Sequence, residues 1–364
     1  MKYLTIIAPR TYPLFFPNTK ASFGGAEVQL FQLANELKNQ NSELSINVFV
    51  ADYGQPKTTI TQNGLTLINA FNFEKNIFGQ FFIFLRLFVF SNHKIVLQRA
   101  MSLFTPIIAI LCKIKGAKFI YMVAHDTEVT LKHPIYKSKL IALFCKTVFN
   151  LADKIIVQNN FQYNHLLKFN NKTYKLGSGY IIPQKNENKN GKYILWIGRS
   201  DSWKNPELFL DIVSEKKEFD FYMICTKAKD YESEYFNKIK IRAQNLSNCI
   251  FKEYIPFHEI NTVFENTSIL INTSENEGFS NTFIQSAMNY VPVLSLNSNP
   301  NNIYDDGKIG FCFNGNIIKL KEKIDELIMN PSQISEIGQE AYKYALKKHS
   351  INQITRDLIK ILEY

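Results

Sequence analysis

The sequence predicts a protein of two α/β domains, each built on a parallel β-sheet. Short aliphatic segments alternate with longer amphipathic ones, such as 26–38, which carries Leu30, Leu33 and Leu37 on one face. The short segments are apolar on both faces, which is typical of strands that helices cover on both sides. With 364 residues, the chain is long enough for about two domains.

The two halves repeat the same order of elements. In the first half, the expected strands are 3–8, 46–51, 65–69, 95–98, 118–123 and 154–158. The second half restarts in the same way, because a lysine, a tyrosine and aliphatic residues begin both halves. Its expected strands are 193–197, 221–225, 250–251, 269–272 and 293–296. We therefore expect two Rossmann-like domains that face each other across a cleft.

A polar stretch separates the halves. After Pro183, residues 184–192 have neither aliphatic nor aromatic side chains, which is typical of a linker. We place the first domain at 1–182, the linker at 183–191 and the second domain at 192–349. The last segment, 350–364, is helical by its pattern and could cross back onto the first domain.

The composition indicates a protein of a reduced compartment. The five cysteines are scattered, and none has the spacing of a zinc site or a disulfide framework. The apolar run at 3–8 is too short for a signal peptide. The run at 77–90 contains Gln80 and Arg86 and is shorter than the roughly 20 residues of a transmembrane helix. We expect a cytoplasmic protein, at most peripheral on the inner face of the plasma membrane.

Positive charge is concentrated in the first half. Residues 1–190 contain 22 Lys and Arg against 9 Asp and Glu, a net of +13, while residues 191–364 contain 20 against 23, a net of −3. A basic half indicates an anionic partner, although a Lys-rich solvated surface is the plain alternative. No nucleic-acid-binding signature is present, so a nucleic-acid partner is not expected. Aromatic residues near 71–90 favour an anionic membrane surface instead.

Three loops follow expected strands and contain residues suited to an anionic ligand. Gly24 and Gly25 stand at a helix start, where backbone N–H groups can meet a ligand, but a structural turn explains them equally well. Arg199 and Lys204 suit a diphosphate, and the alternative is a pair of surface charges. Glu277 could hydrogen-bond sugar hydroxyls or could simply cap a helix.

Together these loops resemble the retaining family 4 of the GT-B glycosyltransferases. The motifs that carry the resemblance are Gly24-Gly25-Ala26-Glu27, His125-Asp126, GRSDSWKNPELFL at 198–210 and SENEGFSNTFIQSAMNYVPVL at 274–294. They extend over nearly the whole chain and imply the GT-B fold. In that family, the second domain holds a nucleotide-diphosphate sugar and the first domain receives the acceptor.

The resemblance assigns catalytic roles to four residues. Arg199 and Lys204 would neutralise the diphosphate leaving group, and Glu277 would contact the donor sugar. His125, which is an ordinary strand-end histidine without the resemblance, would lie against the donor sugar near the reacting carbon.

The resemblance also implies a set of donor-binding residues. Backbone groups near the phosphates and the sugar would come from Gly24, Gly25, Gly278, Phe279, Ser280 and Asn281. One position departs from the family pattern: the second glutamate, eight residues after the first, is Gln285 here. That residue normally binds the nucleotide ribose, and glutamine keeps an acceptor but loses the charge. Donor affinity is therefore the property that the departure affects.

The implied reaction moves a sugar, as in a hexosyltransferase, from a nucleotide-diphosphate sugar to a glycan or lipid-linked acceptor in bacterial surface-polysaccharide assembly. Its barrier lies in breaking the anomeric C–O bond with retained configuration, so stabilising the departing phosphate should dominate catalysis. The chain has no Asp-x-Asp sequence, and we expect no metal and no cofactor. Two alternatives stay open: a sugar-nucleotide epimerase of similar build, and a non-catalytic nucleotide-sugar-binding subunit in which Gln285 marks lost turnover.

Overall fold

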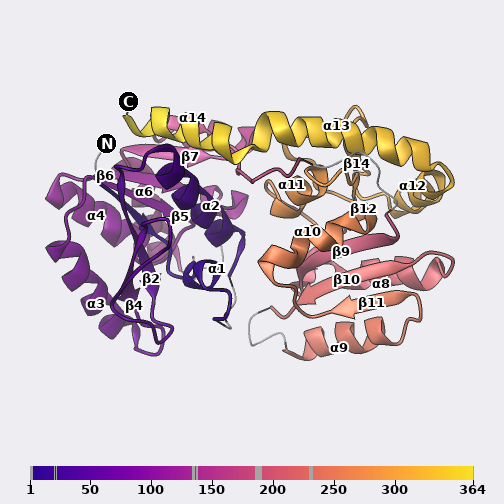
Figure 1. Cartoon of the computed structure of the whole chain (residues 1–364), viewed down its shortest axis with the longest axis horizontal. Helices are drawn as coiled ribbons and strands as arrows, with labels where there is room; N and C mark the ends of the chain where they lie inside the picture. Colours follow the sequence, from indigo (N-terminus) through magenta and orange to yellow (C-terminus); the bar gives the residue numbers. More distant parts are fainter. Residues whose placement is uncertain are drawn as a thin grey trace. The chain divides into compact units, whose positions relative to one another are not determined.

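The chain divides into two compact units in a computed structural model (Figure 1). Unit 1 is Met1–Ile181 together with Ser350–Tyr364, and unit 2 is Ile182–His349. The structure describes residues 3–19, 21, 23–132, 136, 138–184, 191–228 and 233–363. Most of the expected linker, 185–190, lies outside the described residues.

Unit 1 is built on an eight-stranded sheet within the described residues, in the order β3-β4-β2-β1-β5-β6-β7-β8. The strands are β1 (Tyr3–Ile7), β2 (Ser45–Ala51), β3 (Thr58–Ile60), β4 (Thr66–Phe71), β5 (Ile95–Arg99), β6 (Lys118–Met122), β7 (Lys154–Val157) and β8 (Thr173–Lys175). The pairs are parallel except for β3 with β4 at the edge. Chain order reverses between β1 and β5, where ligands bind in open α/β sheets.

Helices cover both faces of this sheet. Successive residues of a strand point to opposite faces, and here both sets of side chains are apolar. Ile6 contributes to the core under one set of helices, and Ile7 contributes to the core under the other. The first set is α1 (Tyr12–Phe15), α2 (Gly25–Gln40) and α14 (Ile351–Glu363). The second set is α3 (Ile77–Phe90), α4 (Thr105–Lys115), α5 (Asp126–Val129), α6 (Lys139–Leu151) and α7 (Asn160–Leu166).

The last helix of the chain, α14, belongs to unit 1. Its Leu358 and Leu362 are buried in the same core as Leu33 and Leu37 of α2. The N–H of Ile351 donates to the carbonyl of Tyr180 at 2.8 Å. A Cβ on Gly179 would lie 3.1 Å from Cα of Ile351 and 2.7 Å from its Cδ1, so a larger residue here would crowd the start of the helix.

Unit 2 is built on a six-stranded sheet within the described residues, in the order β11-β10-β9-β12-β13-β14. The strands are β9 (Tyr193–Arg199), β10 (Phe221–Thr226), β11 (Cys249–Lys252), β12 (Thr267–Asn272), β13 (Val293–Ser295) and β14 (Gly310–Cys312), and the pairs are parallel. The helices are α8 (Pro206–Glu215), α9 (Ser233–Gln244), α10 (Ile260–Glu265), α11 (Asn281–Ala287), α12 (Ile317–Met329) and α13 (Pro331–His349). Short 3-10 helices are η1 (Ser202–Lys204), η3 (Phe257–Glu259) and η4 (Pro300–Asn302). This is the Rossmann strand order, and its reversal lies between β9 and β12.

The predicted fold class is confirmed: both units are α/β, with parallel sheets. Three strands that the sequence did not predict are β3, β8 and β14, each three residues long. Among the described residues, no helix combines the length and the apolar character that crossing a bilayer requires.

Candidate functional site

Two loops of unit 2 meet where the strand order reverses. Strands β9 and β12 are parallel neighbours, with Leu195 opposite Leu270, so the loops that follow them leave the same edge of the sheet. Arg199 is the last residue of β9, Lys204 lies in the loop that follows this strand, and Glu277 lies in the loop that follows β12. Because this edge is the usual ligand-binding place in such sheets, sequence and topology point to the same residues.

Lys204 and Glu277 form an ion pair across the two loops. Nζ of Lys204 contacts Oε1 of Glu277, and Oγ of Ser274 donates to the same oxygen at 2.9 Å. Only 16% of the Lys204 side chain and 8% of the Glu277 side chain are exposed, so each charge depends on the other for compensation. Oε2 of Glu277 takes part in no hydrogen bond among the described residues.

Backbone contacts hold the two loops in register. Oγ1 of Thr273 lies 2.7 Å from the carbonyl oxygen of Lys204 and accepts from Nε1 of Trp196 at 2.9 Å. The N–H of Glu275 donates to the carbonyl of Trp203 at 2.8 Å. Asn205, between η1 and α8, has a left-handed backbone with φ 49°, which turns the chain into the helix. The position of Lys204 is therefore set by the backbone and does not depend on its ion pair alone.

Arg199 is placed differently from Lys204. Its Nη2 lies 2.6 Å from Oδ2 of Asp201, and 55% of its side chain is exposed. Of the two cations expected to act together, Lys204 is mostly buried and paired with Glu277, whereas Arg199 faces solvent and is paired with Asp201. Asp201 was missed in the sequence, although its position two residues after Arg199 was a usable signal.

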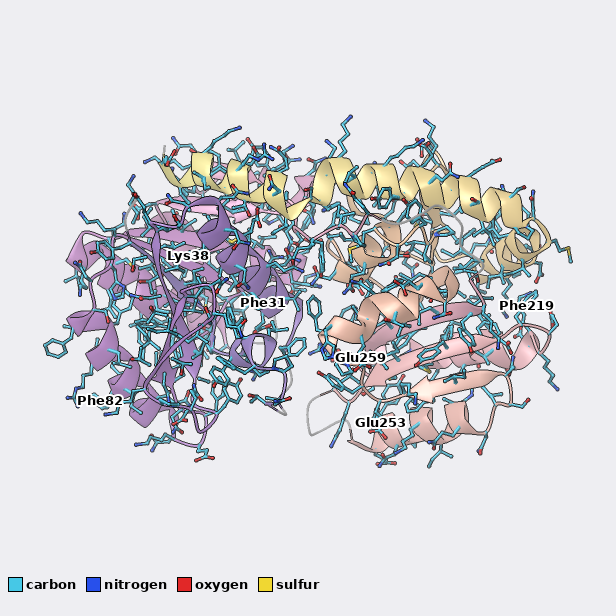
Figure 2. All side chains as sticks on the ribbon, viewed as in Figure 1. Phe31, Lys38, Phe82, Phe219, Glu253 and Glu259 are labelled. Carbon is cyan, nitrogen blue, oxygen red and sulfur yellow. The ribbon has the colours of Figure 1, made fainter. Side chains whose placement is uncertain are left out.

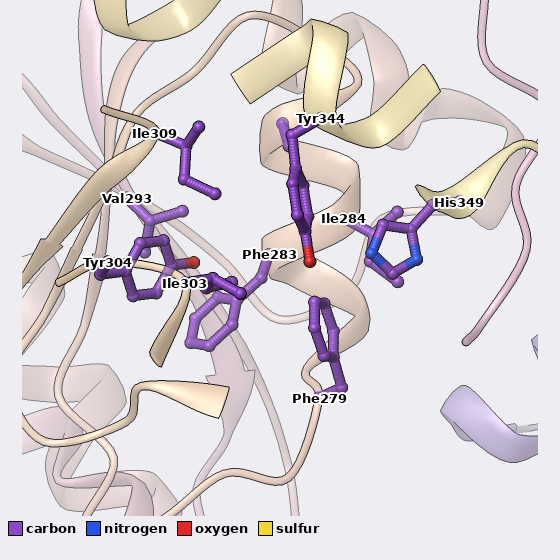
Figure 3. A pocket seen from close by; sticks show the side chains of 10 residues that line it. Phe279, Phe283, Ile284, Val293, Ile303, Tyr304, Ile309, Tyr344 and His349 are labelled. Carbon is purple, nitrogen blue, oxygen red and sulfur yellow. The ribbon is translucent and has the colours of Figure 1, made fainter. Parts of the chain in front are cut away.

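The loop before α11 is anchored by Phe279. Its ring is buried 4.8 Å from the ring of His349, in an apolar pocket that Phe283, Tyr304 and Tyr344 also line (Figure 3). Burial raises the pKa of Tyr344 to about 12, so its phenol stays neutral at physiological pH. The side chain of Phe279 thus serves packing, and only its backbone is suited to a ligand.

The remaining donor-site candidates of unit 2 lie on or beside α11. Ser280 is its N-cap residue, and Oγ of Ser280 lies 2.9 Å from Oγ1 of Thr282. Gly278 is buried, and Asn281 is the first helical residue. Gln285 is buried in the helix, and its carbonyl accepts from Nδ2 of Asn289 at 2.8 Å.

In unit 1, the two expected glycines lie at the start of α2, after β1. Both Gly24 and Gly25 are exposed. Oε2 of Glu27 accepts from the N–H of Gly24 at 2.9 Å, as in a capping box. The Gly24 amide is therefore already used by the protein, and a Cβ on this residue would lie 3.0 Å from the carboxylate.

His125 ends the connection from β6 and is the N-cap residue of α5. Its Nδ1 accepts from the N–H of Thr127 at 3.2 Å, so the neutral ring carries its proton on Nε2. The turn is fixed from the other side by Asp126, whose Oδ1 accepts from Asn159 at 2.9 Å and from Gln162 at 2.8 Å.

A buried polar network under this turn was missed in the sequence. Oε2 of Glu128 accepts from the hydroxyl of Tyr121 at 2.6 Å and from the N–H of Ala124 at 3.2 Å. Burial raises the pKa of Glu128 to about 7, and burial lowers the pKa of the neighbouring Arg99 to about 10. The available signal was Arg99, a charged residue that ends the apolar strand β5, whereas Glu128 lies in α5 and no local pattern marks it.

The expected site residues thus form two groups. Gly24, Gly25 and His125 belong to unit 1, and the others, from Arg199 to Gln285, belong to unit 2. Within the described ranges, no cluster of three or more His, Cys, Asp or Glu side chains could hold a metal ion.

Comparison with solved structures defines the fold. HepE of Anabaena, in complex with UDP and glucose, matches over 100% of both chains at 16% identity with a TM-score of 0.78. Sucrose-phosphate synthase of Thermosynechococcus elongatus matches over 100% of this chain and 98% of its own at 13% identity with a TM-score of 0.81. A glycosyltransferase of Rickettsia africae matches over 99% and 97% at 17% identity with a TM-score of 0.67. The chain therefore has the GT-B fold of glycosyltransferases.

A family match adds to the likeness of fold. Residues 180–344, which contain Arg199, Lys204, Glu277 and Gln285, match the family model of glycosyl transferases group 1. No curated protein matches the sequence significantly. The resemblance to GT-B glycosyltransferases is confirmed, and both findings support a glycosyltransferase.

Proposed function

We propose that the protein transfers a sugar from a nucleoside-diphosphate sugar to a glycan or lipid-linked acceptor, with retention of the anomeric configuration. The observation that carries the proposal is the pairing of Lys204 with Glu277 at the strand reversal of a glycosyl transferases group 1 domain. Solved structures of HepE, which has the same fold, contain UDP-glucose or UDP. Assembly of a bacterial surface polysaccharide is the setting that we propose.

The ion pair has capacity left for a donor. An ammonium group has three N–H donors, and the contact with Glu277 uses one, so Lys204 can bind a phosphate oxygen without releasing its partner. Oε1 of Glu277 is occupied by Lys204 and Ser274, whereas Oε2 can accept from a sugar hydroxyl. One pair would thus hold the diphosphate and the sugar at a fixed separation.

The departing diphosphate gains negative charge as the anomeric C–O bond breaks. Lys204 is held in place before the reaction, so its stabilisation of that charge costs little reorganisation. Arg199 is exposed and can add a forked contact after a small side-chain rotation away from Asp201. We propose that His125 donates from Nε2 to the donor sugar, because Nδ1 is already an acceptor.

Incubation with a panel of nucleotide sugars and acceptors tests the proposal. Release of nucleoside diphosphate with a glycosylated product is expected, and the product's anomeric proton coupling in NMR spectra reports retention. An altered sugar on an intact nucleotide would instead indicate an epimerase. Binding without any conversion across the panel would indicate the non-catalytic subunit.

Substitution of Arg199 provides the site-specific control. Arg199→Ala should lower kcat/KM by tenfold to more than a hundredfold, since a charge-assisted hydrogen bond contributes roughly 1.5–3 kcal/mol. Arg242→Ala removes another arginine of the same unit, on α9, which likewise pairs with an aspartate, Asp211. Equal loss of transfer in both variants would contradict a specific role for Arg199.

The membrane is the place where we propose that the protein meets a lipid-linked acceptor. The support is the net charge of +13 on residues 1–190 against −3 on residues 191–364. A net positive region is attracted to anionic lipid headgroups.

A further inference from the structure

Three helices of unit 1 are apolar on the side that faces away from the sheet. Helices α3, α4 and α6 pack side by side on one face of the sheet, with Phe84, Phe88 and Cys145 completely buried beneath them. Large apolar side chains on the same helices are between 63 and 84% exposed. We call these the outer face: Phe78, Phe82, Phe90, Ile114, Leu140 and Leu143. Phe82 lies at the outer margin of unit 1 (Figure 2).

The spacing shows that the outer face follows from helical geometry. In α3, Phe78 and Phe82 are four residues apart and lie on one side, whereas Phe84 and Phe88 point to the sheet. In α6, Leu140 and Leu143 lie outward in the same way. A helix that is apolar all round is usually buried on every side. Here the side that faces away from the sheet is exposed, which is typical of an interaction surface.

The charge on the three helices has one sign. They contain one, two and two Lys or Arg residues, five in all, and no Asp or Glu. Arg86 and Lys139 are exposed beside the outer face. Lys113 is paired with Asp153 at 2.7 Å, and Lys115 keeps its charge but is held to the end of α3 by the carbonyl of Ser91 at 2.7 Å, so Arg86 and Lys139 are the cations best placed to reach a partner.

The positive charge of this surface favours an anionic bilayer over a second copy of the chain as its binding partner. A second copy of the chain would bring like charges together, which opposes association. A bilayer with anionic lipids offers an apolar interior below a layer of negative headgroups, which matches apolar side chains mixed with cations. At 14 residues, α3 is about 21 Å long and suits a position along the interface.

We propose that the outer face of α3, α4 and α6 docks unit 1 on an anionic lipid bilayer. Phe78, Phe82, Leu140 and Leu143 enter the headgroup region, and Arg86 and Lys139 contact lipid phosphates. The inference rests on the membrane association in the proposed function and locates it on the molecule. Lipid binding is independent of sugar transfer in the measurement below, so each can fail alone.

Co-sedimentation of the full chain with vesicles tests the docking surface. Vesicles of phosphatidylcholine with phosphatidylglycerol should bind at least tenfold more protein than vesicles of phosphatidylcholine alone. Raising the salt from about 0.05 M to about 0.5 M should weaken binding by tenfold or more, because screening shortens the reach of the charges. Equal binding to both kinds of vesicle, or none, would overturn the proposal.

Two variants assign the binding to the outer face. Phe78→Ser combined with Phe82→Ser, Leu140→Ser and Leu143→Ser removes the apolar part, and Arg86→Glu with Lys139→Glu reverses the charge. Each should reduce binding at least tenfold. Ile318→Ser with Met329→Ser, at exposed apolar positions of α12 in unit 2, is the control and should bind as the parent does. Circular dichroism verifies that every variant is folded.

Two further outcomes would overturn the inference. Undiminished vesicle binding by both outer-face variants would place docking elsewhere. A concentration-dependent dimer in light scattering that only the serine variant disrupts, without vesicle binding by the parent, would assign the face to self-association. Nucleoside diphosphate release, measured on the same samples without vesicles, reports separately on the proposed function.

Discussion

Lys204 and Glu277 compensate each other's charge in the fold, and in the proposed function they also contact the donor. Each is mostly buried, and each compensates the charge of the other. A loss of activity after substitution of one partner is therefore ambiguous, because the remaining buried charge also destabilises unit 2. Separating the two roles requires a pair of substitutions.

The double variant Lys204→Met with Glu277→Gln should recover stability without recovering activity. Lys204→Met alone leaves a buried carboxylate and should lower the free energy of unfolding by about 3–5 kcal/mol. The double variant has no uncompensated charge, so most of that loss should return, while transfer stays at least tenfold down. Urea unfolding and initial rates measure the two properties. Recovery of the rate along with the stability would show that the pair is only structural.

Gln285 is the position where this chain departs from the pattern of the family that it resembles. We expect Gln285→Glu to bind a nucleoside diphosphate at least as tightly as the parent, because a charged acceptor bonds ribose hydroxyls more strongly. Gln285→Ala should weaken binding by about 1–3 kcal/mol, through hydroxyls left unpaired. Calorimetric titration measures all three affinities. Three equal values would remove Gln285 from the site.

Glu128 should make the stability of unit 1 fall as the pH rises. Its pKa is about 7 in the folded protein against an ordinary 4.5, chiefly because of burial. The folded state therefore binds more protons than the unfolded state between these values, and roughly 2–3 kcal/mol of stability is lost between about pH 5 and about pH 8. Glu128→Gln cannot ionise, and its loss over that range should be smaller by the same amount. Chemical unfolding monitored by circular dichroism checks this, and parallel pH curves would contradict it.

Individual candidate site residues could be predicted from the sequence, but the side chains that they contact could not. Arg199, Lys204 and Glu277 could be singled out because polar residues directly after apolar strands lie at the ligand-binding edge. The contact between Lys204 and Glu277 joins residues far apart in the chain and depends on β9 lying beside β12, which no local pattern specifies. Glu128 was missed for the same reason, because its burial results from tertiary packing.

At the scale of elements, helix α14 connects the end of the chain to its beginning. Its apolar side packs on α2 and its start bonds to Tyr180. Amphipathic spacing predicted this helix, and most strands were predicted within one or two residues. The strands β3, β8 and β14 were not, because each has three residues and none stands out as an aliphatic run as the equally short β13 does.

Leu358→Ala should destabilise unit 1 and leave unit 2 unchanged. Removing a completely buried leucine costs about 2–5 kcal/mol. Both tryptophans, Trp196 and Trp203, lie in unit 2, so fluorescence follows that unit, while circular dichroism follows both. Urea unfolding should show an earlier dichroism transition with an unchanged fluorescence midpoint. Lys360→Ala, at an exposed position of α14, is the control, and an equal shift of both signals would contradict the assignment of α14 to unit 1.

At the scale of the whole molecule, the repeated pattern of strands and helices was enough to predict two α/β units. The match of 180–344 to glycosyl transferases group 1 covers unit 2 almost completely, and that unit also carries the most specific sequence motif. The acceptor was not predictable, because the described part of unit 1 shows a basic and apolar surface but no motif of a particular acceptor.

The place of α14 in unit 1 has a consequence for how the protein is made. Domains generally fold as they leave the ribosome, starting from the N-terminus. Unit 2 is one continuous segment and can fold once its last strand and helices have emerged, whereas unit 1 waits for Ser350–Tyr364, which are translated after all of unit 2. Unit 1 is thus begun before unit 2 but completed after it, and its core beside α2 stays open until α14 has emerged.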